Sequence, residues 1–197
     1  MKTLLVTGGI GSGKSAVCAY LGERGIPVYD SDAAVKRLYD TDPDLLASLE
    51  TLFDTPLRQD DGRLDRKKLA AILFSDPRAL AQLEAVVHPA VLRDFLRWRD
   101  ARAGAPFVIL ESAIATSKPL FDDVYDAVLL VTAPEQQRLE RACRRDKASE
   151  EAVRRRMATQ HFDLLRADAV VNNDQGRDAL HERTDIALKV LSLSIEK

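Results

Sequence analysis

Five short runs of apolar residues, separated by longer stretches with helical patterning, organise this sequence. Each run is continuous rather than alternating, which is typical of strands buried on both faces of a parallel sheet. Because helical stretches separate successive runs, the pattern predicts an α/β domain built around a parallel sheet. The predicted strands are Leu4–Thr7, Ile26–Tyr29, Phe107–Leu110, Ala127–Thr132 and Ala169–Val171.

The longest stretch without a strand pattern follows the second run, over residues 33–104. A histidine–proline step within it, His88-Pro89, either marks a pocket or separates one helix from the next. We interpret the whole stretch as a helical insertion that binds a substrate. Its helix-start signals, in which an Asp can cap the first turn, are Asp42-Pro43, Asp65-Arg66 and Asp76-Pro77.

A second interruption, over about 134–165, reads as two helices that begin after Pro134 and Ser149. Within 138–156, eight Arg and Lys residues stand against four acidic ones, although the chain as a whole carries a net charge of −2. One interpretation is a solvated pair of helices laced with ion pairs, the usual meaning of such a charge run. The other is a mobile lid whose arginines close over phosphate groups.

Composition narrows the class of protein. The 197 residues are 46% hydrophobic and 30% charged, the balance of a globular protein with a sizeable core. The near-neutral charge does not predict binding to nucleic acid or to membranes, and no apolar run exceeds six residues. With no signal-peptide pattern and two isolated cysteines, Cys18 and Cys143, we expect a cytoplasmic protein. We expect a monomer, although the sequence leaves an oligomer open.

A glycine-rich loop between the first run and a helix over about 14–24 carries the clearest chemical signal. Residues Gly8–Ser15 read GGIGSGKS and match the phosphate-binding pattern G-x-x-x-x-G-K-[ST] in full. The glycines let backbone N–H groups surround phosphate oxygens, Lys14 neutralises the β and γ phosphates, and the Ser15 hydroxyl ligates Mg²⁺. This predicts binding of a nucleoside triphosphate with Mg²⁺. The expected nucleotide-binding residues here are Gly9, Ile10, Gly11, Ser12, Gly13, Lys14, Ser15 and Ala16.

Acidic residues follow two of the other predicted strands, at the edge of the sheet where ligands bind in open α/β folds. Asp32 is either a general base at the reacting group or a cap for the helix that follows. Asp30 is placed either near the metal or in the same capping role. Glu111, which ends the third run, is a candidate for holding Mg²⁺ through water.

These motifs together resemble one known family, the dephospho-coenzyme A kinases, across nearly the whole chain. The loop with its preceding Thr7 looks like that family's narrower version of the phosphate-binding pattern. Asp30-Ser31-Asp32 is similar to the family's Asp-Ala-Asp element. The remaining similar elements are Gly62–Arg66, His88-Pro89, the pattern Pro134, Arg138, Arg141, Arg145-Asp146 and Gln160, and the pattern Ala167-Asp168 with Asn173.

The resemblance implies an ATP-dependent kinase that phosphorylates the ribose 3′-hydroxyl of dephospho-CoA, the last step of coenzyme A biosynthesis. The implied fold is the three-layer α/β fold of P-loop nucleoside triphosphate hydrolases, with a helical insertion and an Arg-rich lid. Its nucleotide-binding core would comprise 1–32 and 105–197, with the lid at about 134–165, and the acceptor-binding insertion would be 33–104.

The resemblance also implies roles for single residues. Asp32 is the base, and Lys14 and Arg141 supply catalytic positive charge. Arg145 binds the nucleotide, and the substrate contacts are Thr7, Asp32 and His88. The chain departs from the family after the third strand, where it reads Glu111-Ser112-Ala113 rather than Pro-Leu-Leu-Phe-Glu.

Three alternatives remain open at this point. Another small-molecule or nucleoside monophosphate kinase would share the loop, the insertion and the lid. A GTP-dependent switch would bind guanine through an Asn-Lys-x-Asp motif, which this sequence lacks. A non-catalytic nucleotide-binding module would have no need of Lys14, Ser15 and Asp32 together.

Overall fold

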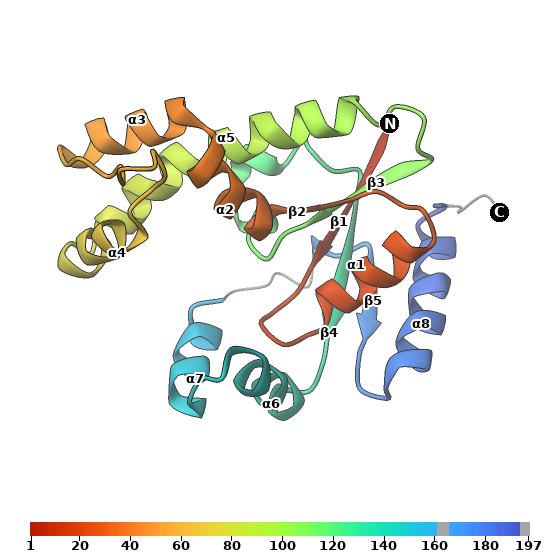
Figure 1. The fold of residues 1–197 in the computed structure, drawn as a ribbon. Helices are drawn as coiled ribbons and strands as arrows, with labels where there is room; N and C mark the ends of the chain where they lie inside the picture. The colour runs from red at the N-terminus through yellow and green to blue at the C-terminus, as the bar shows by residue number, and fades with distance from the viewer. Residues whose placement is uncertain (161–165, 194–197) are drawn as a thin grey trace. The chain divides into compact units, whose positions relative to one another are not determined.

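The computed structural model describes residues 1–160 and 166–193, and it shows two compact units (Figure 1). The first, here called the sheet unit, comprises Met1–Asp30 and Arg102–Lys197. The second, the helical unit, comprises Ser31–Ala101. Residues 161–165 of the predicted lid lie outside the described residues.

The sheet unit contains one five-stranded sheet in which every neighbouring pair of strands is parallel. All five predicted strands are present, and the second starts two residues later than expected. The spatial order is β2-β3-β1-β4-β5, so β1 lies in the middle of the sheet. The strands are β1 (Lys2–Thr7), β2 (Val28–Asp30), β3 (Phe107–Glu111), β4 (Ala127–Thr132) and β5 (Ala169–Asn172).

Helices flank this sheet, as the α/β prediction requires. Helix α1 follows the phosphate-binding loop and ends at Glu23, and Gly25, the residue after its C-cap Arg24, has the positive φ of 86° that suits this position. Apolar residues of α1 and α8 share one core with alternate residues of the strands, which the 0% exposure of Val17 and Leu21 reflects. The helices of this unit are α1 (Lys14–Glu23), α6 (Glu135–Asp146), α7 (Glu150–Ala158) and α8 (Arg177–Val190), with short 3₁₀ turns at Ala115–Ser117 and Pro119–Phe121.

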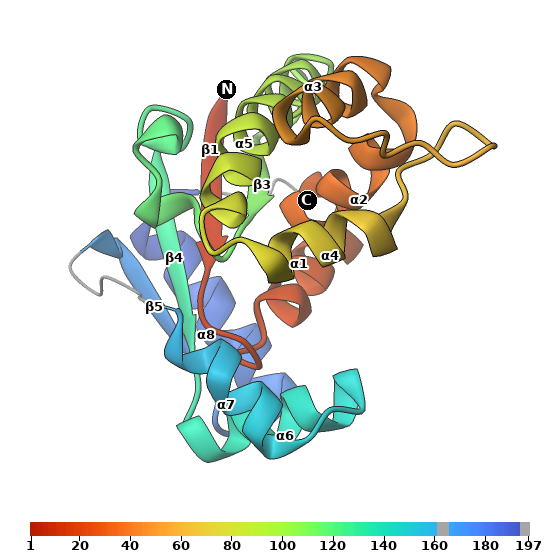
Figure 2. The ribbon, with the colours of Figure 1, turned by 90° about the vertical axis from the view of Figure 1, so that its left-hand side faces the viewer.

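The helical unit has four helices, and three of them pack against the long α5 (Figure 2). Two of the predicted aspartate caps form as expected. The carboxylate of Asp42 accepts hydrogen bonds from two backbone N–H groups of α3, and Asp65 does the same for α4. The helices are α2 (Ser31–Thr41), α3 (Pro43–Phe53), α4 (Arg66–Ser75) and α5 (Ala79–Asp100).

Two local expectations are wrong. Helix α5 begins at Ala79 rather than at Pro77, and it continues through His88-Pro89, so this step does not separate two helices. Proline removes one backbone hydrogen bond from a helix interior. The residues on either side, Val87 and Ala90, are buried in the unit's core, and this packing keeps the helix continuous.

The capping interpretation of Asp32 is also wrong. Helix α2 begins at Ser31, so Asp32 is its second residue and lies inside the first turn. Asp32 is exposed there, and it does not hold the position before the first helical residue that a cap requires. In the described part of the chain, no helix is both long enough and apolar enough to cross a membrane.

Candidate active site

The phosphate-binding loop connects β1 to α1, and tight packing explains its glycines. Gly8 and Gly11 have φ angles of 146° and 75°, which side chains rarely adopt. A Cβ atom at Gly8 would overlap the carbonyl oxygen of Val131 on β4, and one at Gly11 would overlap the carbonyl oxygen of Arg138 on α6. The neighbouring backbone therefore shapes this loop as much as its own sequence does.

Asn173, the residue after β5, holds the end of the loop. Its side-chain Nδ2 donates a 2.9 Å hydrogen bond to the carbonyl oxygen of Ser12, and Asn173 is buried. The same amide occupies the space that a side chain at Gly13 would need, where φ is 105°. Composition and spacing do not single out this asparagine, which entered the sequence analysis only as part of the family pattern.

Replacing Asn173 with alanine should loosen the loop. The change leaves a buried carbonyl of the loop without its donor, which costs about 1–3 kcal/mol of unfolding free energy. We expect the KM for ATP to rise and the urea midpoint to fall. The exposed neighbour Asn172 provides the matched control. If Asn172→Ala and Asn173→Ala have equal effects on the KM for ATP, the loop does not depend on this bond.

Several N–H groups of the loop remain available to a ligand. The N–H of Ile10 donates to Oε1 of Gln160 at 2.8 Å, and the N–H of Ser12 donates to the carbonyl oxygen of Gly9. Within the described residues, no protein acceptor takes the N–H groups of three others, at the helix start where anions bind well. These are Gly11, Gly13 and Ser15.

Lys14 and Ser15 begin α1 with side chains turned to different partners. The Lys14 ammonium donates to the carbonyl oxygen of Gly8 at 2.8 Å, so its positive charge lies against the loop. The Ser15 hydroxyl donates to Oε1 of Glu111 at 2.6 Å. The loop thus carries a cation and, at the start of α1, a hydroxyl–carboxylate pair.

Glu111 is a buried carboxylate at the carboxyl end of β3, 8% exposed. Besides Ser15, the Cys18 thiol donates a hydrogen bond to it. Burial, and then the charge of Glu111, raise the pKa of Cys18 well above its usual value, so the thiol stays neutral and able to donate. Asp30 lies beside Glu111 in the register of β2 with β3. Cys18 went unrecognised in the sequence, although its spacing of three residues from Ser15 puts both on one helix face.

The residues present fit a magnesium ion that accompanies ATP. A hydroxyl and a carboxylate offer the oxygen ligands that Mg²⁺ prefers, and this ion usually takes its other ligands from water and substrate phosphates. Across residues 1–160 and 166–193, no group of three or more His, Cys, Asp or Glu side chains could hold a metal by itself.

Among the eight cationic residues of the α6–α7 segment, two sets of arginines differ in their contacts. Arg138 and Arg141 contact the loop and its neighbours. Nε of Arg138 donates to the carbonyl oxygen of Ile10 at 3.0 Å, and Nη2 of Arg141 donates to Asn173 O at 3.1 Å. Nη1 of Arg141 is buried and has no hydrogen-bond partner among the described residues. A buried donor of this kind is costly unless a ligand accepts from it.

The second set forms exposed ion pairs. Arg145 and Arg156 both bond to Asp146, and their hydrogen bonds hold the pKa of that carboxyl far below its usual value. Arg154 pairs with Glu135 at 3.3 Å. The solvated-helix interpretation therefore describes this set, which includes Arg145, whereas Arg138 and Arg141 face the loop.

A cavity of about 290 Å³ adjoins the loop. Gly9, Ser12 and Arg138 line it together with Leu130–Ala133 at the end of β4. Near the loop, the hydroxyls of Thr7 and Ser12 are buried and, among the described residues, have no hydrogen-bond partner. Thr7 was expected to contact substrate, and an unsatisfied hydroxyl is compatible with such a contact.

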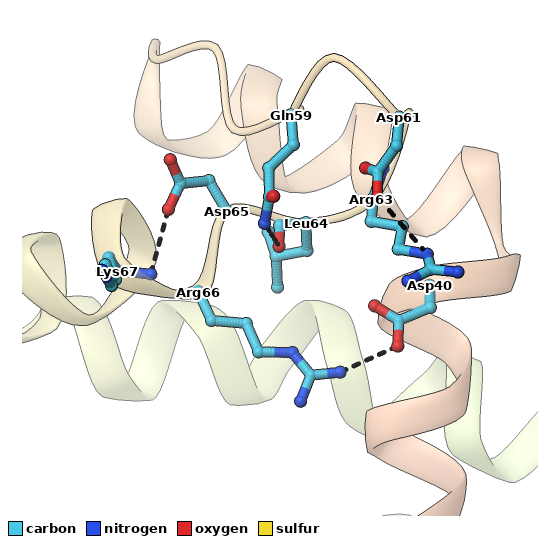
Figure 3. A pocket seen from close by; sticks show the side chains of 8 residues that line it. All are labelled: Asp40, Gln59, Asp61, Arg63, Leu64, Asp65, Arg66 and Lys67. Carbon is cyan, nitrogen blue, oxygen red and sulfur yellow. Dashed lines mark hydrogen bonds and ion pairs between the residues drawn. The ribbon is translucent and has the colours of Figure 1, made fainter.

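The other two expected substrate residues belong to the helical unit. Asp32 lies in the first turn of α2, and His88 is half-buried in the middle of α5. Asp32 lines a cavity of about 470 Å³, and a separate, more polar cavity lies beside the turn at Gly62 (Figure 3). Chain connectivity links Asp32 to the sheet unit, since only Ser31 separates it from Asp30 at the end of β2.

Known proteins are similar to this chain along most of its length. The family model described as Dephospho-CoA kinase matches residues 3–178. A dephospho-CoA kinase from Porphyromonas gingivalis is 43% identical over 169 residues, which cover 86% of this chain and 82% of the relative. One from Chlorobaculum tepidum is 38% identical and covers 97% of this chain and 95% of its own length.

A solved structure extends the similarity to three dimensions. The crystal structure of a protein from Thermus thermophilus superposes with a TM-score of 0.81 at 36% identity, over 98% of both chains. The family match spans the loop, the helical unit and β5, which are the parts that the sequence resemblance had joined. The chain therefore belongs to the dephospho-CoA kinase family.

Proposed function

We propose that the chain transfers the γ-phosphoryl group of ATP to the ribose 3′-hydroxyl of dephospho-CoA, giving coenzyme A and ADP. Membership of the family supports the reaction and its acceptor. The observation that carries the chemistry is the loop, whose packed glycines leave the N–H groups of Gly11, Gly13 and Ser15 for phosphate oxygens. This reaction completes coenzyme A biosynthesis.

The loop and its surroundings hold the nucleotide. In phosphoryl transfer the protein mainly aligns the reacting groups and stabilises the charge on the transferred group. Lys14 turns from the loop carbonyls to the β and γ phosphates, and Nη1 of Arg141 donates to a phosphate oxygen. Ser15 and Glu111 would hold Mg²⁺, which neutralises phosphate charge when bound.

Asp32 orients the acceptor hydroxyl and accepts its proton as the new P–O bond forms. Three observations support this role of Asp32. It lies two residues beyond β2, it is exposed and does not cap a helix, and it lines a cavity. Water competes with the acceptor as a nucleophile, so closure of the α6–α7 segment would favour transfer over hydrolysis.

The two sets of arginines lead to a prediction about rates. Arg141→Ala should lower kcat by about 10²-fold, because it removes a donor that acts on developing phosphate charge. Arg154→Ala should leave kcat nearly unchanged, since Arg154 is half-exposed and its ion pair is on the surface. Steady-state ADP release measures both. Equal and small losses for the two variants would contradict the role of Arg141.

A direct assay tests the reaction itself. The protein is incubated with ATP, Mg²⁺ and dephospho-CoA, and mass spectrometry detects a product heavier by one phosphoryl group. Phosphorus NMR then distinguishes a 3′-phosphate from a 2′-phosphate. Shikimate and AMP serve as competing acceptors, since other small-molecule kinases share the fold. Faster turnover of either one than of dephospho-CoA would contradict the proposal.

A further inference from the structure

Ile10 of the phosphate-binding loop packs its side chain against the small hydrophobic core of the α6–α7 segment. That core consists of Leu139, Ala142 and Val153, each at most 1% exposed. The other partly buried side chains around it, over 143–157, belong to the segment itself, so among the described residues Ile10 alone comes from the loop. The loop lies beside α6 and α7 in the ribbon as well (Figure 2).

The backbone of Ile10 is bonded to the same segment. Its N–H donates to Oε1 of Gln160 at 2.8 Å, and its carbonyl oxygen accepts from Nε of Arg138 at 3.0 Å. Gln160 continues the end of α7, since its own N–H donates to the carbonyl oxygen of Met157 at 3.1 Å. Both polar backbone groups of Ile10 are therefore held, one through α6 and the other through the turn that ends α7.

The glycines on either side of Ile10 allow this close approach. A Cβ atom at Gly9 would lie 2.2 Å from Nη2 of Arg138, and one at Gly11 would lie 2.1 Å from the carbonyl oxygen of Arg138. Glycine also gives a free chain more conformations than any other residue does. A loop with glycines at both sides of Ile10 would thus be flexible on its own, and contacts with the segment remove that freedom.

We propose that the α6–α7 segment sets the shape of the phosphate-binding loop through Ile10, which makes Ile10 a positioning residue for ATP. The inference deepens the proposed function and rests on its nucleotide. A loop that is already ordered loses less conformational entropy when a ligand binds, so affinity rises. The N–H groups left for phosphate, at Gly11, Gly13 and Ser15, follow Ile10 in the chain, and its anchorage fixes the start of their path.

Val153→Ala tests the inference from a residue outside the loop, because Val153 is fully buried in the core of the segment. The change should raise the dissociation constant of AMP-PNP with Mg²⁺ about tenfold and alter kcat less than about twofold. Ile10→Ala should have the same effects. Ile10→Val keeps most of the side chain and should bind nearly as wild type does. Isothermal titration calorimetry measures binding, and ADP release at saturating ATP measures kcat.

Val128→Ala is the matched control. Val128 is 4% exposed and lies near the start of β4, paired with Leu5 rather than with the loop. The same truncation is thus made in the same unit, and the dissociation constant should stay at the wild-type value. The double variant Ile10→Ala/Val153→Ala should bind no more weakly than the weaker single variant, because both changes remove one shared contact.

Gln160→Ala keeps the test decisive if Val153→Ala folds poorly. It removes the acceptor of the Ile10 N–H and should raise the dissociation constant of AMP-PNP about fivefold. Gln136→Ala is its control, because Gln136 is exposed on α6 and bonds to Glu140 instead of the loop. Circular dichroism verifies that each variant is folded.

Weaker binding by Val153→Ala and Ile10→Ala at an unchanged kcat supports the inference. Wild-type or tighter binding by Val153→Ala and Gln160→Ala would overturn it, since the segment would then not order the loop. Equal weakening in Val128→Ala would show a general loss of stability, and effects that multiply in the double variant would show separate contacts, so both results also overturn it. Wild-type protein that binds AMP-PNP but leaves dephospho-CoA unphosphorylated would instead overturn the proposed function, while the binding comparison still decides the role of Ile10.

Discussion

Lys14→Ala is expected to lower turnover by about 10³-fold or more while leaving the fold intact. Phosphoryl transfer spreads negative charge over the oxygens of the transferred group, and the Lys14 ammonium lies against the loop that holds them. Its ammonium bonds to a loop carbonyl rather than to a core group, so stability should change little. ADP release and urea unfolding of the same preparation measure the two quantities.

A matched lysine separates this effect from a general loss of charge. Lys189 is exposed on α8, in the same unit, and Lys189→Ala should retain wild-type turnover. Near-normal rates of ADP release by Lys14→Ala would contradict the assignment of this loop as the phosphate-binding loop. A large fall in its unfolding free energy would show instead that Lys14 serves the fold.

Asp32→Asn is expected to lower kcat by about 10²-fold and to leave the KM for ATP within a few-fold of wild type. The amide keeps the size of the side chain but cannot accept the proton of the ribose hydroxyl. The nucleotide depends on the loop, which this change does not touch. Because Asp32 is exposed in the first turn of α2, the loss of unfolding free energy should stay under about 1 kcal/mol.

Two other aspartates complete the experiment. Asp44 is likewise the second residue of its helix, so Asp44→Asn reproduces the change in helix electrostatics without any role in the reaction. Asp30→Asn tests the neighbour of Glu111, and a milder defect that added Mg²⁺ relieves would place Asp30 near the metal. If Asp32→Asn and Asp44→Asn have the same small effect on kcat, Asp32 is not the base.

Local signals in the sequence predicted most of the fold. The five strands could be predicted because each is a continuous apolar run bounded by polar or turn residues. Burial on both faces demands that composition in the inner strands β1, β3 and β4, whereas the edge strand β5 leaves Val170 exposed. The caps at Asp42 and Asp65 could be predicted because capping depends on atoms two or three residues away. The phosphate-binding loop could be predicted because it matches the pattern G-x-x-x-x-G-K-[ST] and stands between a predicted strand and a predicted helix.

The wrong or incomplete expectations share one cause, which is that each depends on contacts formed by packing rather than on neighbours in the chain. Pro89 breaks a helix by local rules, but the packing of Val87 and Ala90 in the core outweighs one missing hydrogen bond. The sequence likewise showed eight cationic residues in one segment without indicating which of them face the phosphate-binding loop. That choice depends on the positions of the phosphate loop and of Asn173, which are more than thirty residues away from Arg141 in the chain.

The sequence by itself determined the elements of this protein, the phosphate chemistry and, through its combination of motifs, the family. Only the tertiary structure decided the strand order β2-β3-β1-β4-β5, the pairing of Ser15 and Cys18 with Glu111, and the shape of the cavity beside Asp32. Helix starts, turns and apolar runs are set by neighbours in the chain, so a sequence shows them. Strand neighbours and site contacts form between distant segments, and their energies depend on how those segments pack.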